Sequence, residues 1–229
     1  MIISHRHKFI FIKTNKTAGT SVEIALSKYC GPDDIITPIS KKDEPKRQAA
    51  GGLGPQNYLA PVSSYRVADI GRLFQGRRKK RFYNHISATE VVDAIGLDVW
   101  NSYFKFCFER NPWDRTVSAY YWKHSKEPRP TMTEFIDSGY PSKLKKRGFD
   151  LYSLDGKIAV DAVYRFEHLA DDLDDARQRI GLPTTMELIN AKSNQRKEKR
   201  DYREYFSAND AERIATLFAD EIEHLGYAF

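Results

Sequence analysis

The sequence predicts an α/β fold, with a mainly parallel central sheet that is covered by helices on both faces. Three short apolar runs, rich in β-branched and aromatic residues, are each followed by a helical pattern. The 229 residues are 41% hydrophobic, which suffices for one sizeable core. No internal repeat divides the sequence, and we therefore expect one domain over residues 1–229.

The first strand-helix unit lies at the start of the sequence. Residues 8–12 predict a buried strand because the run is short, apolar and ends at turn-type residues. A helix is predicted over about residues 19–29. Prolines and glycines interrupt the next segment, so residues 31–76 predict an irregular insertion with a short helix near residues 68–74.

Two further units follow the insertion. Residues 81–84 predict a second short strand, and a capping box at residues 87–90 then opens a helix. Residues 103–108 predict the third strand. Asn111 and Pro112 follow it as the N-cap and first residue of a helix that extends to about residue 123.

The C-terminal third contains a turn and two helical patterns. Asp155-Gly156 predicts a turn between two short strand patterns, the second continuing to residue 164 or 166. An acidic amphipathic helix is predicted up to about residue 180. A last helix is expected from Ser207 to Gly226.

Ligands of parallel sheets bind beyond the carboxyl ends of the strands. This rule selects residues 13–21, 84–87 and 109–118.

Residues 13–21, KTNKTAGTS, join the first strand to its helix. A loop at a helix N-terminus presents unpaired amides to an anion, and Lys16 adds a cation. Ala18 and Gly19 let a ligand approach the backbone, and Thr20 and Ser21 add hydroxyl donors. The alternative is an ordinary capping box over residues 20–23 with solvent-facing lysines.

Arg110 and Ser118 form a second candidate site beyond the third strand. The arginine lies at the strand end, and the serine lies about two turns into the next helix, so both could reach one phosphate. Alternatively, Arg110 pairs with Glu109 or Asp114, and Ser118 is a small packing residue.

These motifs together resemble the sulfotransferase family that uses 3′-phosphoadenosine 5′-phosphosulfate (PAPS), most closely its carbohydrate-type branch. The resemblance implies a P-loop-like three-layer domain in which Arg110 and Ser118 hold the 3′-phosphate. The residues implied to hold the 5′-phosphosulfate are Lys16, Thr17, Ala18, Gly19, Thr20 and Ser21. Residues 164–169 and 222–229 also look like family features. Asn15 departs from the pattern, because many relatives have proline before the lysine.

The resemblance further implies in-line transfer of the sulfuryl group to a hydroxyl of an acceptor, a carbohydrate or glycolipid. The desulfated nucleotide PAP is the other product, and no metal is required. Lys16 is expected to stabilise the leaving oxygen, and His85 to act as the base. His168 is the alternative base, and His85 could instead merely pack at a helix start. A basic loop containing Arg196 is expected over the 3′-phosphate, although a solvated charge run explains it equally well.

Charge and composition limit the kinds of partner and compartment that we expect. Lys and Arg number 37 against 31 acidic residues, a net charge of +6 that permits a polyanionic partner. The two cysteines fit a reducing compartment, and no apolar run is long enough to cross a bilayer, so we expect a cytoplasmic protein.

Two rival functions are a P-loop-type kinase and a basic nucleic-acid-binding domain. The kinase is disfavoured because the Walker pattern needs an earlier glycine, and a lysine after the last glycine. Nucleic-acid binding would weaken steeply with salt and would survive His85→Ala. We expect neither.

Overall fold

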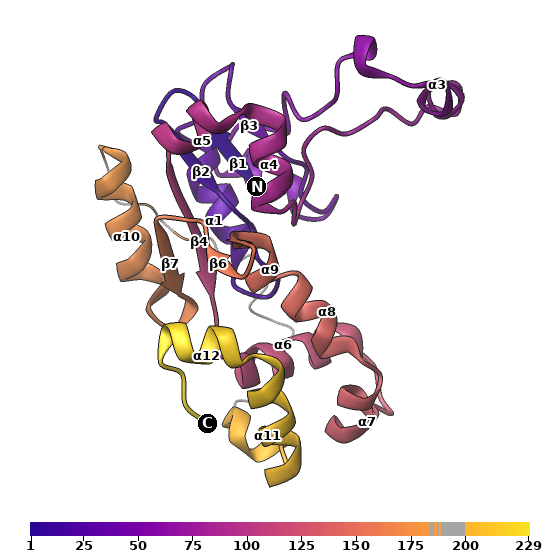
Figure 1. The fold of residues 1–229 in the computed structure, drawn as a ribbon, viewed down its shortest axis with the longest axis vertical. Helices are drawn as coiled ribbons and strands as arrows, with labels where there is room; N and C mark the ends of the chain where they lie inside the picture. The colour runs from indigo at the N-terminus through magenta and orange to yellow at the C-terminus, as the bar shows by residue number, and fades with distance from the viewer. Residues whose placement is uncertain (184–185, 187, 189–199) are drawn as a thin grey trace.

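The computed structural model describes residues 1–183, 186, 188 and 200–229. Its main sheet has the strand order β3-β1-β2-β4-β7 (Figure 1). The strands are β1 (Ile2–Ser4), β2 (Phe9–Phe11), β3 (Ile35–Ile36), β4 (Phe104–Glu109) and β7 (Ala162–Arg165). β2, β4 and β7 pair in parallel, whereas β1 is antiparallel to both β2 and β3. The prediction of a mainly parallel sheet is therefore confirmed.

Helices cover both faces of this sheet. The helices of the described residues are α1 (Gly19–Ser27), α2 (Glu44–Ala49), α3 (Val67–Phe74), α4 (Ala88–Ile95), α5 (Leu97–Ser102), α6 (Pro112–Lys123), α7 (Met132–Asp137), α8 (Tyr140–Lys146), α9 (Phe149–Tyr152), α10 (Leu169–Ile180), α11 (Ala208–Leu217) and α12 (Ala219–Leu225). Side chains alternate along β2, so Phe9 and Phe11 pack with α1 and α10 on one face. Ile10 packs on the other face with α4, α5 and α9.

A third apolar cluster lies beyond the sheet. α6 contributes Trp113 and Val117 to it, and these pack with side chains of α7, α8 and α11. Asn111 caps α6, because its side chain accepts hydrogen bonds from the backbone amides of Trp113 at 3.1 Å and Asp114 at 3.3 Å. The predicted N-cap and the proline at the first position of α6 are confirmed.

The second predicted strand is wrong. Residues 81–84 form no strand; nearby, Lys80 makes one isolated bridge with Leu59. In the sheet, β1 and β4 lie on either side of β2, so residues 81–84 take no place beside that strand. Phe82 is instead buried against the sheet. The capping box that follows is confirmed, with Ser87 as the N-cap of α4.

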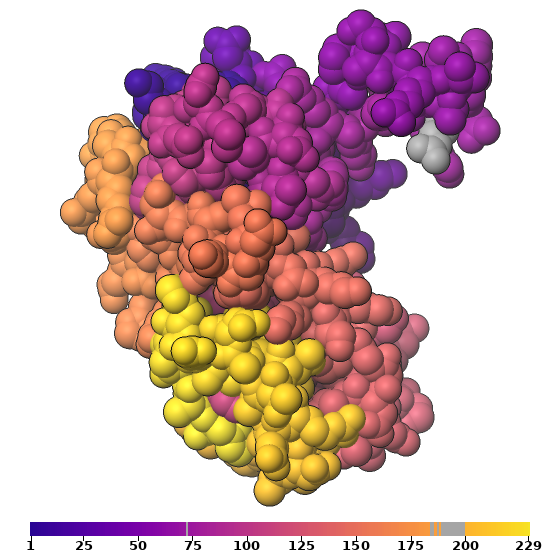
Figure 2. All heavy atoms as spheres, viewed as in Figure 1, coloured from indigo at the N-terminus to yellow at the C-terminus, as the bar shows by residue number. Residues whose placement is uncertain are grey.

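The region expected as an irregular insertion is partly ordered into the fold. Its β3 pairs with β1, and α2 packs near α1. The predicted short helix is confirmed as α3, which Figures 1 and 2 show on an arm standing away from the sheet.

The C-terminal elements follow the predicted order. The Asp155-Gly156 turn joins β5 (Ser153–Leu154) to β6 (Lys157–Ile158), a separate two-stranded sheet. The last predicted helix divides at Phe218 into α11 and α12, since this buried residue has non-helical dihedral angles. Within the described part of the chain, no helix has the length and apolar character needed to cross a membrane.

Candidate active site

The loop between β2 and α1 lies across the end of β4. Thr14 holds it there, since its hydroxyl donates to the carbonyl oxygen of Phe108 and contacts the Thr17 hydroxyl at 2.7 Å. The amide of Asn15 donates to the carbonyl oxygen of Arg147 at 2.8 Å. The loop is therefore fixed on two sides by segments far away in the sequence.

The backbone of this loop takes left-handed conformations at the start of α1. Lys16 and Ala18 have positive φ values of 67° and 59°, and Ala18 is the N-cap. Its carbonyl oxygen accepts from the amides of Ser21 at 2.8 Å and Val22 at 3.2 Å. In the part of the chain that is described, no acceptor faces the amides of residues 17–20. These amides and the helix dipole form a site suited to an anion.

The alternative reading of this loop, a capping box over residues 20–23, is wrong. Glu23 is fully buried and pairs with Lys13 and with the Met1 ammonium group. Burial opposes its ionisation, but the charge of Lys13, the largest opposing cause, helps to lower the pKa of Glu23 to about 2. A Cβ on Gly19 would lie 2.8 Å from Cγ of Lys13, so the glycine makes room for this lysine.

Arg110 lies at the end of β4 and faces the same loop. Its guanidinium pairs with Asp114 at 2.6 Å and lies 4.0 Å from the ring centroid of Phe166. Its Nη1 donates to the carbonyl oxygen of Lys16 at 3.3 Å. The expected alternative, pairing with Asp114, is thus realised together with the contact to the loop.

The two predicted strand ends therefore meet, as the parallel pairing of β2 with β4 requires. Ser118 is partly exposed on α6, one turn after Asp114, the partner of Arg110. Arg196 lies outside the described residues.

His85 contacts the base of the loop. Its Nδ1 lies 2.8 Å from the carbonyl oxygen of Lys13, so this nitrogen carries the proton and Nε2 is left as the acceptor. Burial is the main cause that lowers the pKa of His85 to about 4, and the charge of Lys13 adds to it. The imidazole is therefore neutral near pH 7.

His168, the alternative base, has different surroundings. It is exposed at the end of the 3₁₀ helix η2 (Phe166–His168), which follows β7. β7 is separated from β2 by β4, so His168 follows a strand that does not adjoin β2. The contact of His85 with the loop favours His85.

Arg115 was not anticipated from the sequence. Its buried guanidinium pairs with Glu109 at 2.6 Å and donates to the carbonyl oxygens of Leu144 at 2.9 Å and Arg147 at 3.1 Å. A signal was available, since Glu109 lies in an apolar strand and a buried carboxylate needs a cationic partner.

A family model described as "Sulfotransferase family" matches residues 1–228. The chain belongs to the sulfotransferase family. This agrees with the resemblance that the loop and the Arg110 segment indicated.

Individual proteins resemble this chain only over part of its length or at low sequence identity. An uncharacterized protein of Archaeoglobus fulgidus is 32% identical over 103 residues, which are 43% of this sulfotransferase and 84% of that protein. A crystal structure of a sulfotransferase from Alicyclobacillus acidocaldarius is 19% identical, with a TM-score of 0.43 over 97% of this chain and 96% of that chain. Mouse sulfotransferase SULT7A1 complexed with PAP is 12% identical, with a TM-score of 0.49 over 96% of this chain and 86% of that chain. The assignment rests on the family match and not on these two structures.

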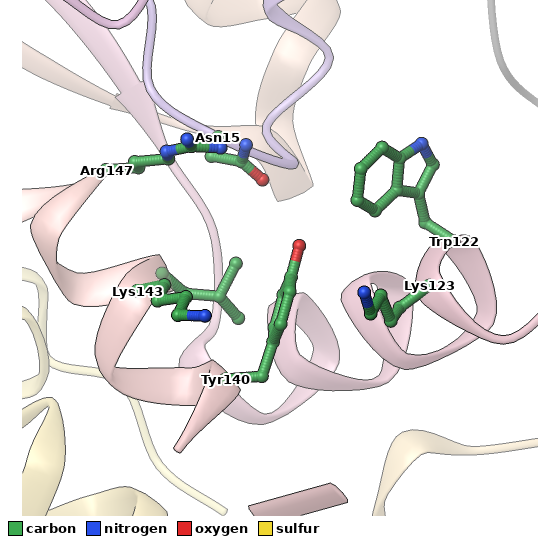
Figure 3. A pocket seen from close by; sticks show the side chains of 7 residues that line it. Asn15, Trp122, Lys123, Tyr140, Lys143 and Arg147 are labelled. Atoms are coloured by element: carbon green, nitrogen blue, oxygen red, sulfur yellow. The ribbon is translucent and has the colours of Figure 1, made fainter. Parts of the chain in front are cut away.

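The sulfotransferase has a pocket of about 310 Å³ beside the loop (Figure 3). It is lined by Asn15, Trp122, Lys123, Tyr140, Lys143, Leu144 and Arg147. Across the described ranges, no group of three or more His, Cys, Asp or Glu side chains could hold a metal ion.

Proposed function

We propose that this sulfotransferase moves the sulfuryl group of PAPS to a hydroxyl group of a carbohydrate or glycolipid acceptor and releases PAP. The observation that carries the proposal is the contact between the two strand ends. Arg110 Nη1 lies 3.3 Å from the carbonyl oxygen of Lys16, so a cation and the amides at the start of α1 share one edge of the sheet. A nucleotide with phosphate groups at both its 3′ and 5′ positions needs two such anion sites close together.

In this proposal the loop holds the 5′-phosphosulfate. The amides of residues 17–20 and the hydroxyls of Thr20 and Ser21 supply donors, and the dipole of α1 adds a positive field. The Thr17 hydroxyl instead donates to the hydroxyl of Thr14, so Thr17 contributes its amide. Arg110 and Ser118 bind the 3′-phosphate, joined by Arg196. The stacking of Arg110 on Phe166 supports its role, because the ring holds the guanidinium plane in one orientation.

Lys16 is assigned to the leaving oxygen. Its Nζ lies 5.7 Å from the centroid of the Trp122 ring, so the ammonium group extends from the loop towards the pocket. Negative charge develops on the bridging oxygen as the bond to sulfur breaks, and a cation fixed there stabilises that charge. One such group contributes on the order of 10² to 10³ in rate.

His85 is assigned to the acceptor proton. A neutral imidazole whose Nδ1–H is held by a carbonyl presents Nε2 as a base, which suits removal of a hydroxyl proton. The lowered pKa keeps this nitrogen unprotonated over the physiological range, although it also makes the free imidazole a weaker base.

Calorimetry and labelled transfer test the proposal together. The purified protein should bind PAP without magnesium, show no binding of ATP, and transfer label from ³⁵S-PAPS to a saccharide acceptor. Lys16→Ala should lower kcat about 10² to 10³-fold, whereas Lys28→Ala, at the exposed far end of the same helix, should leave it unchanged. Failure to bind PAP, or turnover by Lys16→Ala equal to the wild type, would refute the proposal.

A further inference from the structure

Three cations surround the pocket beside the loop. Lys123 is the last residue of α6, Lys143 lies on α8, and Arg147 is the C-cap of α8. No carboxylate lines this pocket. The pocket is therefore positive on two sides, and both sides belong to helices with fixed positions in the third apolar cluster.

Within the described ranges, Lys123, Lys143 and Arg147 make no ion pair with a carboxylate. Lys145, on the same helix as Lys143, is paired with Asp220 at 2.8 Å. Like charges gathered around one cavity repel one another, and an anion placed among them removes that cost. The charge pattern indicates a negatively charged group in the pocket.

Two aromatic side chains complete the lining. Trp122 is 47% exposed, unusually so for a large apolar side chain. Figure 3 shows the hydroxyl of Tyr140 directed into the cavity, with Trp122 and Lys143 on opposite sides of it. Lys143 Nζ is 6.0 Å from the centroid of the Tyr140 ring. Aromatic faces beside cations suit a ring that carries an anionic group.

The pocket adjoins both residues assigned to the chemistry. Asn15 lines it and is followed by Lys16, whose ammonium group lies over Trp122. His85 contacts the carbonyl oxygen of Lys13 at 2.8 Å, two residues before Asn15, whose amide donates to the carbonyl oxygen of Arg147 at 2.8 Å. A molecule in this pocket would face the transferring group between these two side chains.

We propose that the acceptor is an acidic carbohydrate, whose carboxylate or sulfate group is bound by Lys123, Lys143 and Arg147 while Trp122 and Tyr140 pack against the sugar ring. This inference rests on the proposed function, because it treats the pocket as the acceptor side of the reaction. Under this inference, acceptor specificity depends on Lys123, Lys143 and Arg147, which lie outside the proposed donor site.

The test compares two acceptors that differ in one charged group. p-Nitrophenyl β-D-glucuronide and p-nitrophenyl β-D-glucoside share their ring and aglycone but differ in a carboxylate. Binding of each to the PAP-loaded enzyme is measured by calorimetry, and transfer from ³⁵S-PAPS gives kcat/KM. We expect the glucuronide to be preferred about tenfold or more.

The variant for this test is Lys123→Gln with Lys143→Gln, and its control is Lys126→Gln with Lys146→Gln, two exposed lysines that do not line the pocket. The first double variant should reduce the preference to within about threefold while binding PAP as the wild type does. The control should keep the preference.

Three results would overturn the inference. The first is a glucuronide that binds no better than the glucoside, including no binding of either at millimolar concentration. The second is a control that loses the preference equally. The third is loss of PAP affinity in the Lys123 and Lys143 variant, which would assign the pocket to the donor. A wild-type protein that fails to bind PAP refutes the proposed function itself, so the two failures are distinguishable.

Discussion

Nε of Arg115 donates a 2.9 Å hydrogen bond to the carbonyl oxygen of Asn15, a residue 100 positions earlier in the chain. The amide of Asn15 in turn donates to the carbonyl oxygen of Arg147. A Cβ on Gly148 would lie 2.4 Å from Nη1 of Arg115, so a side chain there would displace the guanidinium. The shape of the loop thus depends on one buried arginine and on the backbone after α8.

Asn15→Pro should destabilise the protein. Proline lacks the N–H that donates to Arg147, and it also restricts the preceding Thr14. We expect a loss of about 1–3 kcal/mol in the free energy of unfolding, measured by chemical denaturation. Asn15→Ala keeps the N–H and should lose less than about 1 kcal/mol. Equal stability of the two variants would contradict the role of this amide.

Arg110→Ala should chiefly weaken donor binding. Loss of a charge-assisted contact to a phosphate, together with exposure of the Asp114 carboxylate near it, should reduce PAP affinity about 10- to 100-fold. Arg179→Ala removes another arginine from a surface ion pair with Asp175 and should leave the affinity unchanged. Calorimetry with PAP compares the two, and an unaltered affinity in Arg110→Ala would remove the 3′-phosphate assignment.

The dependence of kcat/KM on pH should reflect the lowered pKa of His85. Since its pKa is lowered to about 4, kcat/KM should rise through about pH 4 and then stay level through pH 7 as far as this group is concerned. His85→Gln should lower kcat about 10² to 10⁴-fold, whereas His168→Gln should retain activity. An acidic limb near pH 6.5, or inactivity of His168→Gln with an active His85→Gln, would assign the base elsewhere.

Glu221 should make the protein less stable as the pH rises. Its side chain is buried, and neither carboxylate oxygen has a hydrogen-bond partner within the described residues. Burial, followed by the negative charge of Glu109, raises the pKa of Glu221 to about 7. The folded state therefore keeps a proton that the unfolded state releases above about pH 4.5.

The contribution of the protonated Glu221 to the free energy of unfolding is complete below about pH 4.5 and is lost as the pH rises through 7. The free energy of unfolding should fall by about 3 kcal/mol over this range from this group alone. Glu221→Gln should abolish this part of the slope and should be more stable than the wild type at pH 8. Denaturation midpoints across this range provide the measurement, with the exposed Glu212→Gln as control. Identical slopes in Glu221→Gln and the wild type would contradict the effect.

Local patterns predicted most of the fold. Phe9 to Phe11 and Phe104 to Glu109 are apolar runs that end at turn signals, and the caps at Ser87 and Asn111 are local in sequence. The strand prediction for residues 81–84 was wrong because it used composition alone. Whether a segment forms a strand also depends on the strands that lie beside it in the fold. β1 was not predicted as a separate strand, because three residues give little periodicity.

The meeting of the loop with the Arg110 segment could be predicted, because both directly follow strands that pair in parallel. The role of Arg115 could not be predicted from the sequence. Its partners come from residues 15, 109, 144 and 147, which meet only in the folded chain. Lys13 was also ambiguous, because only the fold shows that it pairs with Glu23.

The position of α6 has a consequence for how the two substrates are aligned. Ser118 and Trp122 lie four residues apart on this helix, which places them about one turn, or roughly 6 Å, from each other along its axis. In the proposed binding mode, α6 therefore sets the distance between the 3′-phosphate at Ser118 and the sugar ring at Trp122. Under the same proposal, a bend in α6 between Ser118 and Trp122 would shift the acceptor relative to the donor and disturb the in-line arrangement of acceptor oxygen, sulfur and leaving oxygen.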